Sequence, residues 1–226
     1  MHANFLKQQT LLNRAYLKQY ILCSLITLLI ALSTYANLQL NGYSDYGLLN
    51  AVLARFTICI ALVPTLLISV LATTNLRIND ALRCQTRKIL FMQIIYRVTL
   101  IWLLMILFWL IGNILVVGLT NTFGLLSHLL VTLLFRSVYL WLSCYVFGLL
   151  VITLYLYFKN KIVAFFIVFI INGASFSLNT SSHVSLFYDF IAPNFAKIAF
   201  AGIPIMLGIL CILMALLMVV IEKRDF

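Results

Sequence analysis

The stretch VTLIWLLMILFWLIGNILVVGL, residues 98–119, decides the fold. It contains no charged residue, and a helix of this length extends about 33 Å at 1.5 Å per residue. That is enough to cross the roughly 30 Å hydrocarbon core of a bilayer, where a helix satisfies its own backbone hydrogen bonds. Similar apolar stretches recur along the chain. They predict six spans, at approximately residues 20–37, 50–73, 98–119, 137–158, 162–178 and 200–221.

The composition of the whole chain agrees with this interpretation. The 226 residues are 65% hydrophobic and only 9% charged, whereas soluble domains contain roughly 25% charged residues. The apolar runs are continuous rather than alternating, which argues against a transmembrane β-barrel. The five cysteines are scattered and indicate neither a disulfide framework nor a metal cluster. We therefore predict an all-α polytopic membrane protein in which residues 1–226 form a single transmembrane domain.

The basic residues predict how the chain is oriented. Placing both termini in the cytoplasm puts twelve of the 15 lysines and arginines on the cytoplasmic side, as the positive-inside rule requires. The exceptions are Arg55, Arg136 and Lys197. We expect a multi-pass protein of a bacterial plasma membrane, with both termini cytoplasmic. The net charge of +10 then reflects cytoplasmic loops rather than nucleic-acid binding, because the basic residues are divided among four short segments.

Three segments, the three prolines and one glycine depart from a plain series of spans. Residues 3–18 have apolar and basic side chains on opposite sides of a helix, which predicts an amphipathic interfacial helix. The run FGLLSHLLVTLLFRS, residues 123–137, predicts an outer-leaflet or partly inserted helix that leads into span four. Residues 179–199 mix aromatic and polar side chains and predict a re-entrant or interfacial hairpin on the outer side, with its aromatic residues at the membrane interface. Pro64, Pro193 and Pro204, together with Gly202, predict kinks or helix ends.

The chain contains few side chains of the kinds that carry out catalysis. None of its five acidic residues, which are Asp45, Asp80, Asp189, Glu222 and Asp225, falls within a predicted span. A proton-driven transporter or a metal-dependent enzyme would need such groups in clusters. Ser175 is followed by His183 without the glycine turn of a membrane serine protease, so we interpret Ser175 as helix packing. We expect no catalytic residue, cofactor or metal in this chain, which also lacks a phosphate-binding GxxxxGK[ST] motif.

Three polar residues in or near spans are candidates for a substrate path. Arg55 and Arg136 lie near the outer ends of spans, where they could extend to lipid headgroups or line a path for an anionic or peptide substrate. Both interpretations stay open. Asn113 is the third candidate, and Asn113 and Asn172 are also of the kind that form hydrogen bonds between helices.

The most polar part of the chain is TTNLRINDALRCQTRKILFMQIIYR, residues 73–97, between spans two and three. Asp80 belongs to a candidate helix cap, and Arg83, Arg87 and Lys88 would share one face of the helix that follows. A basic amphipathic segment before span one, a polar hairpin before span six and the tail VVIEKRDF accompany this loop. The pattern resembles the permease subunits of ABC transporters in the ABC-2 superfamily, in which this loop carries a coupling helix.

The resemblance implies a dimer of identical or related permeases bound to two cytoplasmic ATPase subunits, with ATP and Mg²⁺ held by those subunits. It implies export of a peptide, bacteriocin or lipid-like molecule, with Asp80, Arg83, Arg87 and Lys88 docking to the ATPase. Anionic lipid is the other candidate partner for the same basic face. Two further classes stay open. The chain could be a non-transporting immunity or scaffold protein that binds a toxin or a signalling partner. A channel is disfavoured because the chain shows no filter sequence.

Overall fold

The computed structural model describes residues 16–74, 87–182, 186–191 and 198–223. Within these ranges every regular element is a helix. In chain order the elements are α2 (Leu17–Leu32), α3 (Thr34–Asn41), α4 (Asp45–Val52), α5 (Arg55–Thr57), the π turn η1 (Ile58–Leu62), α6 (Val63–Thr73), α8 (Arg87–Leu119), α9 (Phe123–Phe158), α10 (Lys161–Ser182), the 3₁₀ turn η2 (Asp189–Ile191), the π turn η3 (Ile198–Gly202) and α12 (Ile203–Lys223).

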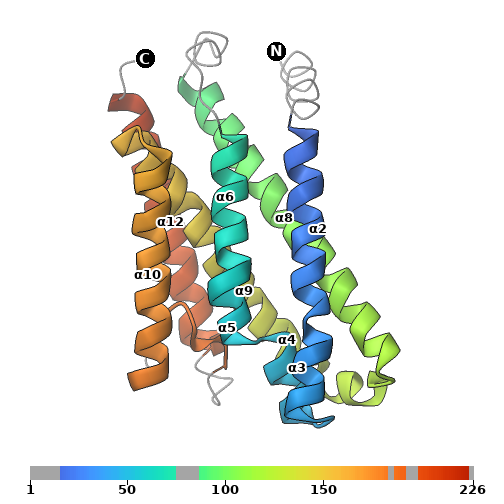
Figure 1. Ribbon diagram of the computed structural model, residues 1–226. Coiled ribbons are helices and arrows are strands. Elements are labelled where there is room, and N and C mark those ends of the chain that lie inside the picture. Colours follow the sequence, from blue (N-terminus) through green and yellow to red (C-terminus); the bar gives the residue numbers. More distant parts are fainter. Residues whose placement is uncertain (1–15, 75–86, 183–185, 192–197, 224–226) are drawn as a thin grey trace.

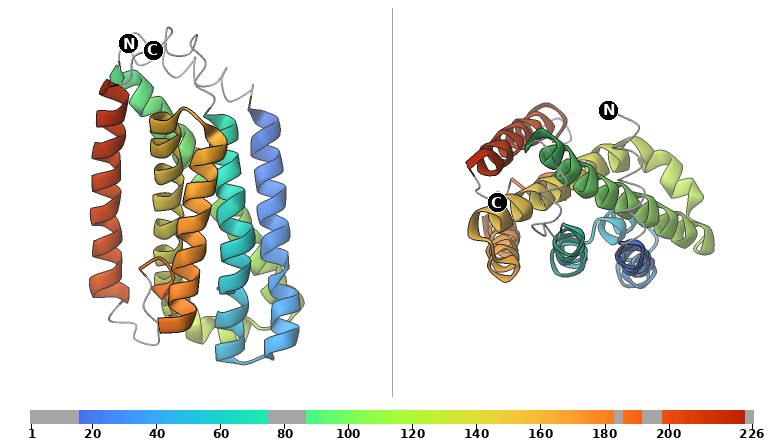
Figure 2. Two further views of the ribbon diagram at one scale, coloured as in Figure 1. Left: turned by 60° about the vertical axis from the view of Figure 1, so that its left-hand side comes forward. Right: turned by 90° about the horizontal axis from the view of Figure 1, so that it is seen from above.

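Six helical runs are long and apolar enough to cross a membrane. They are Leu17–Asn41, Asp45–Thr73, Arg87–Leu119, Phe123–Phe158, Lys161–Thr180 and Phe200–Lys223. Each contains one of the six predicted spans, so the prediction of an all-α fold with six membrane-length helices is confirmed. The helices form a bundle in which α2 begins, and α6 and α12 end, at the same end (Figures 1 and 2).

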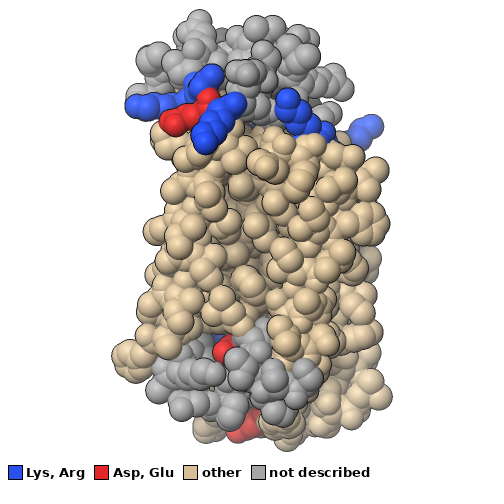
Figure 3. All heavy atoms as spheres, turned by 90° about the vertical axis from the view of Figure 1, so that its left-hand side faces the viewer, with Lys and Arg blue, Asp and Glu red and all other residues tan. Residues whose placement is uncertain are grey.

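Charge is distributed unevenly along the bundle axis. Lysines and arginines gather at one end, and a long stretch of neutral side chains covers the face shown in Figure 3. We call this end the basic end and define it by its described residues Lys18, Arg87, Lys88, Arg97, Lys159, Lys161 and Lys223. The acidic residues Asp45 and Asp189 follow the far ends of α3 and α10, at the opposite end. The sequence predicted this gathering of basic residues on one side of the spans.

Two spans contain a π turn directly before a proline. The π turn η1 precedes α6, whose second residue is Pro64, and the π turn η3 precedes α12, whose second residue is Pro204. Proline has no N–H, and its ring clashes with the carbonyl four residues earlier, so a regular α-helix cannot continue through it. Both prolines therefore mark a change of helix type, as the sequence predicted.

The helices α8 and α9 are the longest, with 33 and 36 residues. At 1.5 Å per residue they extend about 50 and 54 Å, more than the thickness of the hydrocarbon core. The helix α8 slants across the bundle, and the first turns of α9 run across the opposite end before the helix rises through the middle (Figures 1 and 2). The helix expected at residues 123–137 is thus the beginning of one continuous helix. The helix α9 packs against α4, α6, α8, α10 and α12.

The helices α2 and α8 pack closely together at Gly112. A Cβ added there would lie 2.5 Å from the Cβ of Ala31. Neither atom can move by a change of rotamer, because both are bonded directly to the backbone. Small residues of this kind allow two membrane helices to pack with their backbones close together. The contact of the first and third spans therefore requires glycine at position 112.

We expect Gly112→Ala to lower the free energy of unfolding by about 1–3 kcal/mol, because α2 and α8 would have to separate. The measurement is a denaturant titration of the protein in mixed detergent–lipid micelles. Gly208→Ala on α12 is the matched control, because nothing lies within 4 Å of the added methyl group and alanine favours the helix. Equal stability of the two variants would contradict the close approach.

The segment 186–191 folds back against the bundle instead of covering its end. The rings of Phe187 and Phe147 are 4.7 Å apart, and the rings of Tyr188 and Phe176 are 5.8 Å apart. Tyr188 and Phe190 are fully buried, although we expected the aromatic residues of this hairpin at the membrane interface. They pack inside the protein because α9 and α10 offer aromatic partners there. Residues 183–185 and 192–197 of the expected hairpin, and nearly all of the helix expected at 3–18, lie outside the described residues.

Candidate functional site

A series of buried hydrogen bonds connects span two, span five and the segment before η2. The Arg55 guanidinium donates to Asn179 Oδ1 at 2.6 Å, and Asn179 Nδ2 donates to the Tyr188 carbonyl at 3.4 Å. The Tyr188 hydroxyl donates to Asn172 Oδ1 at 2.6 Å, and Asn172 Nδ2 donates to the Cys59 carbonyl at 3.0 Å. We call these five residues the polar network. All of them except the partly buried Arg55 are buried.

The π turn explains why the Cys59 carbonyl bonds to a side chain. In an α-helix this carbonyl would accept from the amide of Val63, but that amide bonds to the carbonyl of Ile58 instead. The following residue is Pro64, which has no N–H to donate. A buried carbonyl without a donor costs about 1–3 kcal/mol. Asn172 supplies the missing donor, so an irregularity of span two is satisfied by span five.

The network places a cation and a neutral phenol in one connected group. Burial raises the pKa of the Tyr188 phenol, which therefore stays protonated and remains a hydrogen-bond donor. The sequence predicted that Asn172 forms a hydrogen bond between helices and that Arg55 could line a substrate path. It missed Asn179, Tyr188 and Cys59. No local signal points to Cys59, because in a regular α-helix Pro64 deprives the carbonyl of Ile60, four residues earlier, and only the π turn transfers the loss to Cys59.

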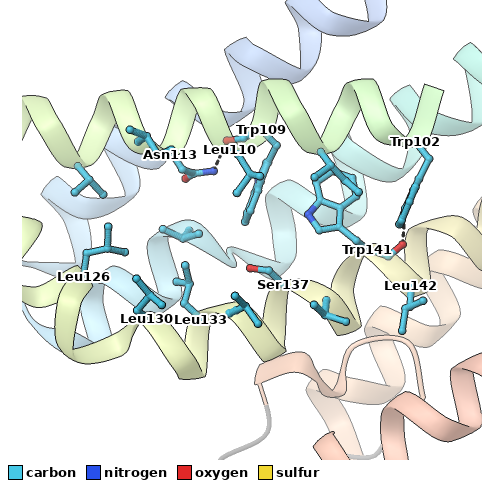
Figure 4. A pocket seen from close by; sticks show the side chains of 16 residues that line it. Trp102, Trp109, Leu110, Asn113, Leu126, Leu130, Leu133, Ser137, Trp141 and Leu142 are labelled. Atoms are coloured by element: carbon cyan, nitrogen blue, oxygen red, sulfur yellow. Dashed lines mark hydrogen bonds between the residues drawn. The ribbon is translucent and has the colours of Figure 1, made fainter. Parts of the chain in front are cut away.

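A second feature is an apolar pocket of about 490 Å³ between α8 and the first half of α9 (Figure 4). The chain has three tryptophans, Trp102, Trp109 and Trp141, and all three line this pocket. Leucine, isoleucine and valine side chains form most of the remaining wall, and none of the described residues that line it is charged. The volume lies within the roughly 300–1,000 Å³ that is typical of small-molecule sites.

Two polar atoms in the pocket wall have no hydrogen-bond partner. They are Ser137 Oγ and Trp141 Nε1, and both atoms are enclosed by neighbouring protein atoms. The other polar groups nearby are satisfied within the protein. Asn113 accepts from Thr34 Oγ1 at 2.9 Å and donates to the Trp109 carbonyl at 2.8 Å. The pocket is thus almost wholly apolar.

At the basic end, two cations cap the last turn of α6. The Arg97 guanidinium of α8 donates to the Thr73 carbonyl at 3.0 Å, and the Lys161 ammonium of α10 donates to the Leu71 carbonyl at 2.7 Å. These carbonyls are among the last four of the helix, which have no amide partner within it. Arg97 also lies over the ring of Tyr16, with 5.3 Å between its Cζ and the ring centroid. We call Arg97 and Lys161 the α6 clamp.

Both clamp residues were predicted to be cytoplasmic charges that orient the chain. Arg97 is only 3% exposed, so its guanidinium contacts the helix end rather than lipid headgroups. A cation near the C-terminus of a helix also interacts favourably with the helix dipole. The clamp therefore ties the end of α6 to α8, to α10 and, through Tyr16, to the start of α2.

The predicted docking residues are described in part. Asp80 and Arg83 lie outside the described residues. Arg87 and Lys88 form the exposed beginning of α8 and line a small hollow together with Glu222. The Arg87 guanidinium donates to the Glu222 carbonyl near the end of α12. The start of span three is thereby joined to the end of span six.

The three residues predicted for a substrate path occupy different surroundings. Arg55 belongs to the polar network. Asn113 lines the apolar pocket, whereas Arg55 and Arg136 do not. Arg136 is buried on α9, so its side chain packs within the protein rather than reaching the surface.

Groups of catalytic type are not brought together in the part of the chain that the structure describes. No three His, Cys, Asp or Glu residues among those described lie close enough to hold a metal ion. The Ser175 hydroxyl donates to the Ile171 carbonyl of its own helix at 2.8 Å, and His183 lies outside the described residues. The hydroxyl of Ser175 is thus engaged within its own helix.

Comparison of the chain with protein-family models, with curated proteins and with solved structures gave no match. The class of protein is therefore defined by the fold. Six apolar helices of membrane-spanning length in an all-helical bundle support a multi-pass membrane protein.

Proposed function

We propose that this chain is the permease subunit of an ABC transporter of the ABC-2 superfamily. Two permease copies would form the substrate pathway, and separate cytoplasmic ATPase subunits would drive it. The cargo would be a peptide, a bacteriocin or a lipid-like molecule that is exported. The six membrane-length helices and the gathering of basic residues at one end support this proposal.

The observation that carries the proposal is the α6 clamp. A subunit driven by a separate ATPase must pass a displacement from a cytoplasmic loop to its spans. Residues 75–86 follow the end of α6 directly, and that end is bonded to α8 by Arg97 and to α10 by Lys161. A partner bound to this loop would therefore act on three spans at once.

Span two also has a place at which it can bend. The π turn η1 and Pro64 interrupt the regular helix below α6, and such interruptions often occur at functional hinges. Beyond the interruption, Asn172 and Asn179 of α10 hold Cys59 and Arg55 of span two. In the proposed mechanism α6 moves with the loop, while the lower part of span two stays attached to α10.

The test is co-purification of the protein from its native membrane, with and without charge reversal in the loop. We expect wild type to carry a stoichiometric ATPase, and Arg83→Glu combined with Arg87→Glu to lose at least about 90% of it, because two attractive charges become repulsive. Lys159→Glu is the matched control. Lys159 is also an exposed cation of the basic end, but it lies between α9 and α10.

Retention of the ATPase by the double variant would contradict docking through this loop. Wild type that carries no ATPase would contradict the transporter itself and favour the immunity or scaffold protein. Equal elution volume of all three proteins in size-exclusion chromatography shows that the substitutions leave the fold intact.

A further inference from the structure

The two interrupted spans, two and six, are connected through the segment 186–191. Span two contains the π turn η1, and the π turn η3 directly precedes α12 of span six. Both turns lie toward the end of the bundle that is opposite to the basic end (Figure 1). The segment forms a chain of contacts with each of them, and each contact can be named.

Tyr139 of α9 forms the connection on the side of η3. A Cβ added at Gly202, the last residue of η3, would lie 2.5 Å from Cε2 of the Tyr139 ring, so the ring packs directly against the glycine backbone. The Tyr139 hydroxyl donates to the carbonyl of Leu186, the first residue of the segment. The Tyr139 side chain is fully buried, so neighbouring side chains hold the ring in place. A shift of η3 therefore displaces Tyr139 and, through its hydroxyl, the segment.

Tyr188 forms the connection on the side of η1. Its hydroxyl donates to Asn172, which in turn donates to the Cys59 carbonyl within η1. Asn172 lies ten residues before Ser182, the last residue of α10, so Tyr188 reaches about 15 Å back along that helix. Both Tyr188 and Asn172 are fully buried. Their hydrogen bonds are therefore protected from competition with water.

The segment has little freedom to absorb a displacement between these two connections. Leu186 and Tyr188 are separated by a single residue, Phe187. The ring of Phe187 is itself held against Phe147 of α9, with 4.7 Å between the ring centroids. A movement that reaches one end of this short stretch is consequently passed to the other end.

We propose that the segment 186–191 couples the two interruptions, so that a change in the bend of span two at η1 alters the bend of span six at η3, and the reverse. The helices α6 and α12, which both end at the basic end (Figures 1 and 2), then tilt together. A coupling free energy between two sites acts equally in both directions. This device does not depend on the proposed transport function, and it would operate equally in a scaffold protein.

The test is hydrogen exchange of the full-length protein in lipid nanodiscs, with each substitution read at the distant turn. Tyr139→Phe keeps the ring against η3 but removes the hydroxyl that donates to Leu186. We expect the amides of residues 56–66, which include η1, to exchange about 3- to 10-fold faster than in wild type, as expected for the loss of one hydrogen bond.

The reverse direction uses Tyr188→Phe, which removes the bond to Asn172 on the side of η1. The amides of residues 198–208, which include η3, should then exchange at least about 3-fold faster than in wild type. Tyr145→Phe is the matched control. It removes a hydroxyl from α9 as well, but that hydroxyl is bonded to Thr99 of α8 at 2.8 Å, so neither peptide should change.

A second pair of variants acts from η3 itself and adds a methyl group instead of removing a hydroxyl. Gly202→Ala forces η3 and the Tyr139 ring apart and should also accelerate exchange in residues 56–66 by at least about 3-fold. Gly208→Ala lies on the same span with nothing within 4 Å of the added methyl group, and it should leave residues 56–66 unchanged.

Three results would overturn the proposal. The first is acceleration that stays confined to the turn nearest each substitution. The second is an equal acceleration in every peptide, including residues 214–221 near the basic end of α12, which would indicate general destabilisation. The third is equal exchange of residues 56–66 in Gly202→Ala and Gly208→Ala. Tyr139→Phe and Gly202→Ala test the same connection independently, so the test does not require both variants to fold.

Discussion

Replacing Asn172 by leucine should lower the free energy of unfolding by about 2–4 kcal/mol. Leucine has a similar volume but can neither donate to the Cys59 carbonyl nor accept from the Tyr188 hydroxyl. Both groups are buried, so each would be left without a hydrogen-bond partner in a region that water does not reach. The measurement is a denaturant titration in mixed micelles, followed by circular dichroism.

Ser175→Ala is the control for this substitution. Ser175 lies one turn further along α10 and donates only to the Ile171 carbonyl of its own helix, so its loss should change stability by less than about 0.5 kcal/mol. The double variant Asn172→Leu, Tyr188→Phe should be less destabilised than the sum of the two single variants. Phenylalanine lacks the hydroxyl that Asn172→Leu would leave without an acceptor. Additive effects would show that the two residues do not act together.

The second large effect is expected at the α6 clamp. In Arg97→Met, amides in the last turn of α6 should exchange hydrogen about 10- to 100-fold faster than in wild type, because a charged donor to the Thr73 carbonyl is lost. The measurement is hydrogen exchange of the full-length protein in lipid nanodiscs, followed by mass spectrometry of peptides that cover residues 66–74.

Arg97→Lys keeps the charge and should restore part of the protection. Lys88→Met removes an exposed cation from the same helix and should leave the peptide unchanged. If Arg97→Met exchanges at the wild-type rate, Arg97 does not hold the end of α6, and the proposed transmission of movement from the loop loses its structural support.

The number, order and approximate limits of the spans were predictable from the sequence, because continuous apolar runs between basic residues are a local property. Pro64 and Pro204 likewise predicted interruptions of their helices, because proline lacks the N–H group that would donate to a carbonyl of the preceding turn. The charge of the basic end followed from the positions of its lysines and arginines relative to the spans. Each of these features depends on the order of residues within one segment.

The candidate sites depend on contacts between distant segments and were predicted only in part. Asn172 was recognised as a residue that would bond to another helix, but its partner Cys59 is 113 positions away, and periodicity carries no information about such a pairing. The three tryptophans were given no role from the sequence. Their convergence on one pocket follows from the slant of α8 across α9, which no local pattern encodes. For the same reason Arg97 was interpreted as an orienting charge rather than as a helix cap.

The length of α8 and α9 has a consequence for the lipid environment. Helices of about 50 Å exceed a hydrocarbon core of about 30 Å, so they tilt, bend or extend beyond it. The balance depends on the thickness of the surrounding bilayer, so lipids with longer or shorter acyl chains change the tilt at which both helices are accommodated. Because the apolar pocket lies between these two helices, the acyl-chain length of the membrane acts on the geometry of its mouth.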